Sequence, residues 1–378
     1  MYIIMENRIL ASFILYAVGD TIGFKNGDWE FNGNSMEKDE YGKFDVNMIN
    51  ELLYEFIDLG GINGINLSGW NVSDDTMLTI AVASGLLKDN SKMEYNDNVV
   101  INIKKKLVKY CDKMMEDEKN DKPRYAGVTT MKYVNIMKND IKKDGRFVAY
   151  DEYSGGNGAA MRIAPVGLMY SGEKKRKTLI TASIEISKLT HNSPHGFLSG
   201  LTLALFVAFG VENIKLEKWP FMLLDILVSD DVVRHINNNA NEKTDYQEYI
   251  NYWRKYTHTR FDDNGVKRVD NMHKNLVFRS RYYYNNFTKG TKSSKIGFSG
   301  YCAVIMCYDS LLDCGGYWEK LVVYSMLHTG DSDTVGSMAG FLYGLVYGFG
   351  DVPESNHKYL EYKDKLKKIS EEFCKLML

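Results

Sequence analysis

The sequence predicts an all-α protein, a single compact orthogonal helical domain covering residues 1–378. Only five prolines interrupt the chain, so few helices are forced to break. Apolar segments of helix length recur along it, whereas alternating strand patterns are scarce. No internal repeat and no Gly/Ser- or Pro-rich linker divides the sequence, which favours one domain over two.

The expected helices share an apolar face or a wholly apolar composition over at least ten residues. They cover residues 9–18, 77–88, 178–190, 196–210, 318–330 and 335–348. The first is expected to be a buried helix and not a signal peptide, because Glu6 and Arg8 precede it and no cleavage pattern follows. The Asn-, Asp- and Tyr-rich segment 236–292 is expected to form less regular insertions.

The uncharged run 334–350 is expected to be a buried core helix. Its seventeen residues are marginal for a bilayer span, and aspartates close it at both ends. Its glycines at 336, 340, 344 and 348 would lie along one helix face. Such a face allows another helix to approach closely.

The charge balance and the cysteine content indicate which binding partners and which cellular compartment to expect. The chain has 47 Lys and Arg against 49 Asp and Glu, so it lacks the basic excess of a nucleic-acid or anionic-membrane binder. The basic runs 104–109 and 173–177 lie near acidic residues and are expected to be solvated faces. Five cysteines without a CxxC pair indicate reduced thiols, so we expect a cytoplasmic protein. We separately expect a monomer.

Two stretches place neighbouring acids directly before an apolar helix. In NVSDDTM, Ser73 is a candidate N-cap and Asp74 and Asp75 occupy the first turn; in HTGDSDTVG, Asp331 and Asp333 precede Thr334. Helix capping explains one such site on its own. If the two helix starts converge, however, four carboxylates meet in a low-dielectric interior and require cations.

Oxygen ligands of this kind select hard ions such as Mg²⁺ or Mn²⁺, and no Cys/His cluster competes for zinc. Two such ions would hold substrate hydroxyls and lower the pKa of a bound water. The sequence therefore indicates a metal-dependent hydrolase.

A glycine-rich stretch, SGGNGAAMR (154–162), suggests an anion site. Gly155, Gly156 and Gly158 precede an expected helix start, where free backbone N–H groups suit a phosphate or diphosphate. The stretch matches neither a P-loop nor a dinucleotide fingerprint, and alone it is more typical of a tight loop. In THNSPHG, His191 follows a helix and is expected to donate to a phosphate, whereas His195 is expected to be structural.

Taken together and in this order, the motifs resemble those of the ADP-ribosylglycohydrolase family, and more narrowly its ADP-ribosylarginine hydrolase branch. The matching stretches are GDTIGFKNGDWEF (19–31), GWNVSDDTM (69–77), AGVTTMK (126–132), GNGAAMR (156–162), THNSPHGFL (190–198) and HTGDSDT (328–334). The resemblance implies an all-α fold around a two-magnesium centre, in which Mn²⁺ is expected to substitute because the same oxygen ligands suit both ions. It also implies ADP-ribosylated proteins and ADP-ribose as partners, and hydrolysis of the bond between ADP-ribose and a modified arginine side chain.

The resemblance also implies roles for individual residues. It assigns metal binding to Ser73, Asp74, Asp75, Asp331, Asp333 and Thr334. It assigns contacts with the ADP-ribose to Gly127, Ser154, Gly156, Asn157, Gly158 and His191. Catalytic roles fall to Asp74, Asp75, Asp331 and Glu30, the last on a flap near the scissile bond.

The chain departs from the arginine branch at Tyr301 and Cys302, where that branch typically has His-Asp, and in the preceding loop 289–298. Hydrolysis of ADP-ribosyl-serine, poly(ADP-ribose) or O-acetyl-ADP-ribose is therefore an alternative activity. A metal phosphohydrolase that attacks phosphorus and a non-catalytic ADP-ribose-binding module are two further alternatives. All four metal-binding aspartates are kept, which favours a working enzyme.

Overall fold

The computed structural model describes residues 2–32, 46–139, 141, 149–237, 239–268, 274–291 and 295–377, and these residues form helices and no strand. The helices are α1 (Tyr2–Phe24), α2 (Val46–Asp58), α3 (Gly61–Gly64), α4 (Asp74–Leu87), α5 (Asp97–Lys119), α6 (Val128–Asn139), α7 (Ala164–Met169), α8 (Arg176–Ser187), α9 (Pro194–Val211), α10 (Trp219–Leu227), α11 (Asp230–Val233), α12 (Ala240–Arg260), α13 (Leu276–Phe287), α14 (Gly300–Cys314), α15 (Trp318–Ser325), α16 (Ser332–Tyr347), α17 (Ser355–Lys358) and α18 (Lys363–Met377). The predicted all-α class is confirmed.

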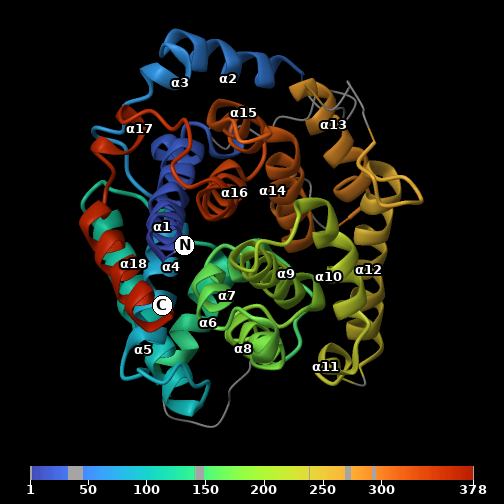
Figure 1. The fold of residues 1–378 in the computed structure, drawn as a ribbon. Helices are drawn as coiled ribbons and strands as arrows, with labels where there is room; N and C mark the ends of the chain where they lie inside the picture. Colours follow the sequence, from blue (N-terminus) through green and yellow to red (C-terminus); the bar gives the residue numbers. More distant parts are fainter. Residues whose placement is uncertain are drawn as a thin grey trace.

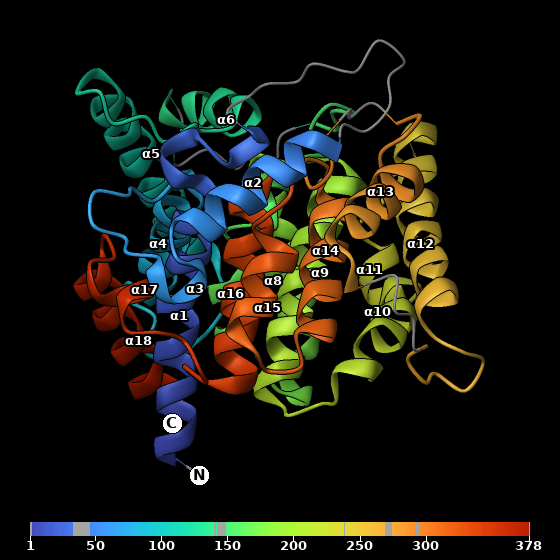
Figure 2. The same cartoon turned by 90° about the horizontal axis from the view of Figure 1, so that it is seen from above.

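Helices α1 and α16 pack against each other at the centre of the molecule (Figures 1 and 2). The glycine face of α16 makes this possible, because a Cβ on Gly336 would lie 2.7 Å from the carbonyl oxygen of Gly19. A Cβ on Gly344 would lie 2.5 Å from the backbone nitrogen of Ser12, and one on Gly340 would overlap the carbonyl of Leu15. The prediction of a close helix approach is therefore confirmed at these three glycines. It is wrong for Gly348, which follows the end of α16 with a φ of 70° and whose added Cβ would meet nothing within 4 Å.

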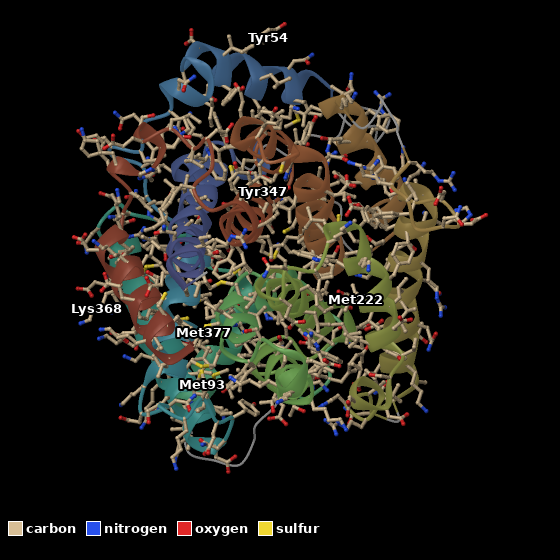
Figure 3. The ribbon with its side chains drawn as sticks, viewed as in Figure 1. Tyr54, Met93, Met222, Tyr347, Lys368 and Met377 are labelled. Carbon is tan, nitrogen blue, oxygen red and sulfur yellow. The ribbon has the colours of Figure 1, made fainter. Side chains whose placement is uncertain are left out.

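The other helices surround this central pair. In both ribbon views α12 runs along one outer edge, while α5 and α18 lie on the opposite side (Figures 1 and 2). In Figure 3 Tyr54 on α2 and Lys368 on α18 project from the surface. Among the described residues, one helix, α9, is long and apolar enough to cross a membrane, and 89% of that span is buried inside the protein.

The expectation of irregular insertions over 236–292 is wrong for the described part of that segment. Helix α12 continues for 21 residues there, and α13 follows it. Tyr249, Trp253 and Tyr256 are buried on one face of α12, at a spacing of four and three residues. This helical period was obscured by the polar composition around it. All five cysteines are free, as the odd count without a CxxC pair predicts, and all five are buried.

Candidate active site

The two acidic helix starts meet. Ser73 caps α4, its Oγ accepting a hydrogen bond from the backbone N–H of Asp75 over 3.1 Å. From the start of α16, the hydroxyl of Thr334 donates to Oδ1 of Asp75 over 3.2 Å, and Ser337 Oγ donates to Oδ2 over 2.8 Å. The first acidic pair therefore begins α4 and is also hydrogen-bonded to the first turns of α16, where the second acidic pair lies.

Glu30 joins this cluster from the segment that follows α1. Carboxylate oxygens of Glu30, Asp331 and Asp333 lie within 4.8 Å of one another, close enough to share one ion. The backbone N–H of Phe31 donates to the carbonyl of Gly330 over 3.0 Å, which ties this segment to the start of α16. Glu30 is buried, and its Oε2 has no hydrogen-bond partner among the described residues. The structure thus brings Glu30 to the acids with which the sequence grouped it.

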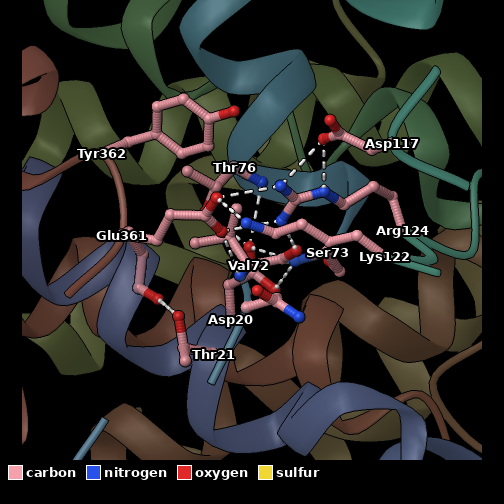
Figure 4. Close-up of polar contacts among 12 residues, drawn as sticks. Asp20, Thr21, Val72, Ser73, Thr76, Asp117, Lys122, Arg124, Glu361 and Tyr362 are labelled. Atoms are coloured by element: carbon pink, nitrogen blue, oxygen red, sulfur yellow. Dashed lines mark hydrogen bonds and ion pairs between the residues drawn. The ribbon is translucent and has the colours of Figure 1, made fainter. Parts of the chain in front are cut away.

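Asp20 is a member of the site that the sequence reasoning missed. From within α1 it accepts hydrogen bonds from the backbone N–H groups of Ser73, at 3.0 Å, and Thr76, at 3.1 Å, and from the Thr76 hydroxyl (Figure 4). It therefore holds the first turn of α4 in place. The signal was available, because Asp20 is the one charged residue in the apolar run 9–24.

Six carboxyl groups are buried together: Asp20, Glu30, Asp74, Asp75, Asp331 and Asp333. Burial raises the pKa of each, and neighbouring carboxylates raise several of them further. The pKa of Asp20 rises to about 6 and that of Asp74 to about 8. Among the described residues, Lys295 interacts electrostatically with Glu30 and Asp331, and Arg162 with Asp74. These two positive charges are few beside six carboxyl groups.

This donor set fits a hard divalent cation. The carboxylate oxygens, with the hydroxyls of Ser73 and Thr334, are the ligand type that Mg²⁺ and Mn²⁺ prefer. The buried, unpartnered oxygen of Glu30 and the excess of acids over bases both indicate a need for added positive charge. The residues that the sequence assigned to metal binding are therefore together in space, with Asp20 and Glu30 beside them.

Asn157 connects the glycine-rich loop to the acids. Its Nδ2 donates to Oδ2 of Asp331 over 2.9 Å and to the carbonyl of Gly297 over 2.8 Å, while its backbone N–H donates to Phe298 over 3.1 Å. The side-chain amide and backbone N–H of Asn157, which were expected to contact ADP-ribose, therefore donate to protein groups in this structure. The expected helix start is also absent here: the loop enters a three-residue 3-10 turn, Asn157–Ala159, and α7 begins only at Ala164.

His191 lies against this loop as a neutral imidazole. Burial and the charge of Arg162 lower the pKa of His191 to about 3. Arg162 Nη2 donates to the hydroxyl oxygen of Thr190 over 2.7 Å, which leaves the Thr190 proton for His191 Nδ1, also 2.7 Å away. The ring proton is thereby assigned to Nε2, on the side that faces Gly158. His191 can donate a hydrogen bond there, as a phosphate contact requires.

Gly127 and Ser154 lie at the same site but contact protein groups. The N–H of Gly127 donates to Oδ2 of Asp74 over 3.3 Å, and the Ser154 hydroxyl donates to the carbonyl of Asp151 over 2.7 Å. Gly127 thus supports a candidate ligand directly. Contact of either residue with substrate remains a prediction.

A pocket of about 370 Å³ opens beside Gly155 and Gly156. Tyr301 lines it and stacks on Tyr252 of α12, with ring centroids 4.1 Å apart and planes 10° from parallel. His195, expected to be structural, also lines the pocket, with its Nε2 3.6 Å from a carboxylate oxygen of Glu248.

Cys302, the second residue that departs from the arginine branch, does not line the pocket. It is buried, and its sulfur accepts a hydrogen bond from the backbone N–H of Gly297 over 3.3 Å. Residues 292–294 of the preceding loop lie outside the described residues.

Known proteins resemble the chain along most of its length. A sequence model of the ADP-ribosylglycohydrolase family matches residues 1–378. A relative from Acanthamoeba polyphaga mimivirus, named as an ADP-ribosyl glycohydrolase, is 36% identical over 375 residues, covering 94% of this chain and 68% of its own. ADP-ribosylhydrolase ARH1 of Dictyostelium discoideum is 29% identical over 395 residues, covering 98% of this chain and 94% of its own. ADP-ribosylhydrolase ARH3 of Mus musculus is 24% identical over 291 residues, covering 75% and 71%.

A solved structure described as an ADP-ribosylglycohydrolase-related protein complex shares the fold, with a TM-score of 0.58 at 15% identity over 99% of both chains. The family match spans the whole chain and includes every acid of the buried cluster. The chain therefore belongs to the ADP-ribosylglycohydrolase family of hydrolases, which act on ADP-ribosylated substrates.

Proposed function

We propose that this protein hydrolyses the N-glycosidic bond between ADP-ribose and an arginine side chain of a modified protein, with two Mg²⁺ ions, or Mn²⁺ in their place, as cofactor. The observation that carries the proposal is the meeting of the two acidic helix starts through Thr334 and Asp75, with Glu30 beside them. The arginine linkage is supported by the likeness to ADP-ribosylhydrolase ARH1, which extends over 98% of this chain.

The proposed metal ligands are Ser73, Asp74, Asp75, Asp331, Asp333 and Thr334. When bound, the cations would supply Lewis acidity that holds the ribose hydroxyls and activates a water molecule. Without them, six buried carboxyl groups with raised pKa values would have to remain partly protonated.

Breaking the anomeric bond of ribose builds positive charge at C1, which a cluster of carboxylates stabilises. Asp75 is proposed to take the proton of the attacking water, since hydrogen bonds from Thr334 and Ser337 fix both of its oxygens. Glu30 is proposed to face the scissile bond from the segment that follows α1, where one of its carboxylate oxygens lies within 4.8 Å of carboxylate oxygens of Asp331 and Asp333. Asp74 and Asp331 complete the negative surface.

The remainder of ADP-ribose is proposed to follow the glycine-rich loop. His191 Nε2 would donate to a phosphate beside Gly156 and Gly158, and the adjoining 370 Å³ pocket would receive the adenosine. Remote contacts of this kind convert binding energy into orientation of C1.

A second candidate is hydrolysis of another ADP-ribosyl linkage, such as ADP-ribosyl-serine, poly(ADP-ribose) or O-acetyl-ADP-ribose. Tyr301 favours it, because this residue departs from the arginine branch and lines the pocket next to the loop.

The test is to incubate the protein and Mg²⁺ with matched peptides carrying ADP-ribose on arginine or on serine, and to identify the products by mass. Release of unmodified arginine peptide and intact ADP-ribose is expected. Faster release from serine would move the assignment to the second candidate. Release of AMP or phosphate would indicate a phosphohydrolase, and binding without any product would indicate a binding module.

A further inference from the structure

We propose that Arg124 and Glu361 are positioning residues that fix the backbone entering the first acidic helix start, and thereby set the affinity of the site for divalent cations. The inference rests on the metal site of the proposed function and concerns two residues whose side chains do not contact the proposed metal ligands. Arg124 lies in the segment that follows α5, and Glu361 lies in the chain that leads into α18 (Figure 4).

The side chains of Arg124 and Glu361 bind both the backbone carbonyl and the backbone N–H of Val72. Arg124 Nη1 donates to the carbonyl of Val72 over 2.7 Å, and the N–H of Val72 donates to Glu361 Oε2 over 3.1 Å. Arg124 and Glu361 are themselves joined by two hydrogen bonds, at 2.7 and 2.9 Å. Val72 directly precedes Ser73, so this arrangement leaves the entry to α4 little freedom.

The backbone around Arg124 also holds Asp74 itself. The N–H of Asp74 donates to the carbonyl of Arg124 over 2.9 Å, and the N–H of Gly127 donates to the Asp74 carboxylate over 3.3 Å. The segment 124–127 therefore contacts Asp74 at both its main chain and its side chain. On the opposite side of Ser73, Asp20 accepts from its N–H.

A guanidinium is required at this position. Arg124 is 2% exposed and is shared by three acceptors: Glu361, the Val72 carbonyl, and Asp117 of α5, to which its Nε donates over 2.9 Å. Lys122 Nζ adds a contact with Glu361 Oε1 at 2.8 Å. The planar fork of arginine can serve all three acceptors, whereas a lysine ammonium on its flexible stem cannot replace it.

The position of these contacts distinguishes this pair from an ordinary stabilising ion pair. In the pair of Arg176 and Glu212, a single nitrogen, Arg176 Nη2, donates to both carboxylate oxygens, at 2.9 and 2.7 Å, and the side chains are 17% and 20% exposed. That pair lies at the start of α8 and the end of α9, and it contacts neither acidic helix start. It provides a matched control for loss of an arginine–glutamate pair alone.

The experiment measures Mn²⁺ and Mg²⁺ binding by isothermal titration calorimetry, and thermal unfolding in EDTA. The proteins compared are wild type, Arg124→Lys, Glu361→Gln and Glu212→Gln. Glu361→Gln keeps the side-chain volume and turns an amide towards Arg124, so it decides the question if Arg124→Lys does not fold. Outer-shell changes weaken metal binding by about 10–100-fold, so we expect an increase in Kd of at least about 10-fold for the first two variants. Glu212→Gln should lower the melting temperature with Kd unchanged.

Unchanged Kd in folded Arg124→Lys and Glu361→Gln would overturn the inference and leave the pair a purely stabilising role. An equal loss of affinity in Glu212→Gln would also overturn it, because the effect would then be general. If wild type binds neither cation, the proposed function itself fails, and the inference fails with it.

Discussion

Thr334 donates a hydrogen bond to Oδ1 of Asp75 over 3.2 Å, across 259 positions of the sequence. Through this contact the starts of α4 and α16 become one site. The close packing of α1 against α16 brings Asp20 to the same place, since this residue extends from α1 to the first turn of α4. The central helices therefore serve as rigid supports for the carboxylates.

Replacing Asp75 or Asp333 by Asn tests the chemical role of the cluster. Each change keeps the side-chain size and removes a charge, so we expect single-turnover rates on ADP-ribosyl-arginine to fall at least about 10²-fold. The double variant should lose far less than the product of the two single losses, because groups that act as one unit are non-additive. Normal rates in both single variants would make these acids helix caps only.

Gly156→Val tests the glycine-rich loop as an anion site. A Cβ there would lie 3.8 Å from His191 Nε2, so the larger valine should fill the space in front of that donor while the fold is retained. We expect ADP-ribose to bind at least about 10-fold more weakly, roughly the value of one charge-assisted hydrogen bond. Calorimetric titrations of ADP-ribose and of Mn²⁺ provide the comparison. A weaker Mn²⁺ affinity with unchanged ADP-ribose affinity would contradict the assignment.

Gly340→Ala tests the packing of α1 on α16. The new methyl group would overlap the carbonyl of Leu15, so the helices must separate, and we expect a loss of about 1–3 kcal/mol from the free energy of unfolding. Urea denaturation measures this change. Gly127→Ala is the control, because the nearest atom to its new Cβ would be 4.0 Å away. Equal stability of Gly340→Ala and wild type would show that this helix contact is looser than described.

The pair of Arg124 and Glu361 predicts a pH dependence of stability. Burial alone would raise the pKa of Glu361, but hydrogen bonds from Arg124 and Lys122 lower it from 4.5 to about 2. A carboxyl whose pKa is lower in the folded state stabilises fully above its unfolded pKa, and this stability is lost as pH falls through the folded value. The stability advantage of wild type over Glu361→Gln should therefore be constant above about pH 5 and shrink towards pH 2. Melting curves across pH 2–7 measure it, and an advantage that grows on acidification would contradict this reading.

The sequence reveals those features that a local pattern encodes. The glycine period of 336–348 predicts a helix contact, which forms at the first three of its four glycines. The doubled acids predict a shared site once their helices converge. Helix α12 was missed because its buried aromatics lie within a polar segment, where hydrophobic periodicity is weak. The helical spacing of Tyr249, Trp253 and Tyr256 can be recognised only when the polar residues around them are disregarded.

Other features depend on contacts between distant segments. Asp20 is one acid within an apolar helix, and only the fold shows that it binds the backbone of Ser73 and Thr76. Asn157 carries a polar side chain in a candidate phosphate loop, but its amide is bound to Asp331 and Gly297. No spacing rule in one sequence identifies which partner such a side chain will find.

The dependence of turnover on divalent cation tests the central claim most directly. ADP-ribosylated arginine peptide is incubated with the protein in EDTA, then with Mg²⁺ or Mn²⁺ restored, and free ADP-ribose is quantified by mass. Because the oxygen ligands of the acidic cluster favour hard ions, we expect no detectable release in EDTA and full recovery with either cation. Release at the full rate in EDTA would contradict the account.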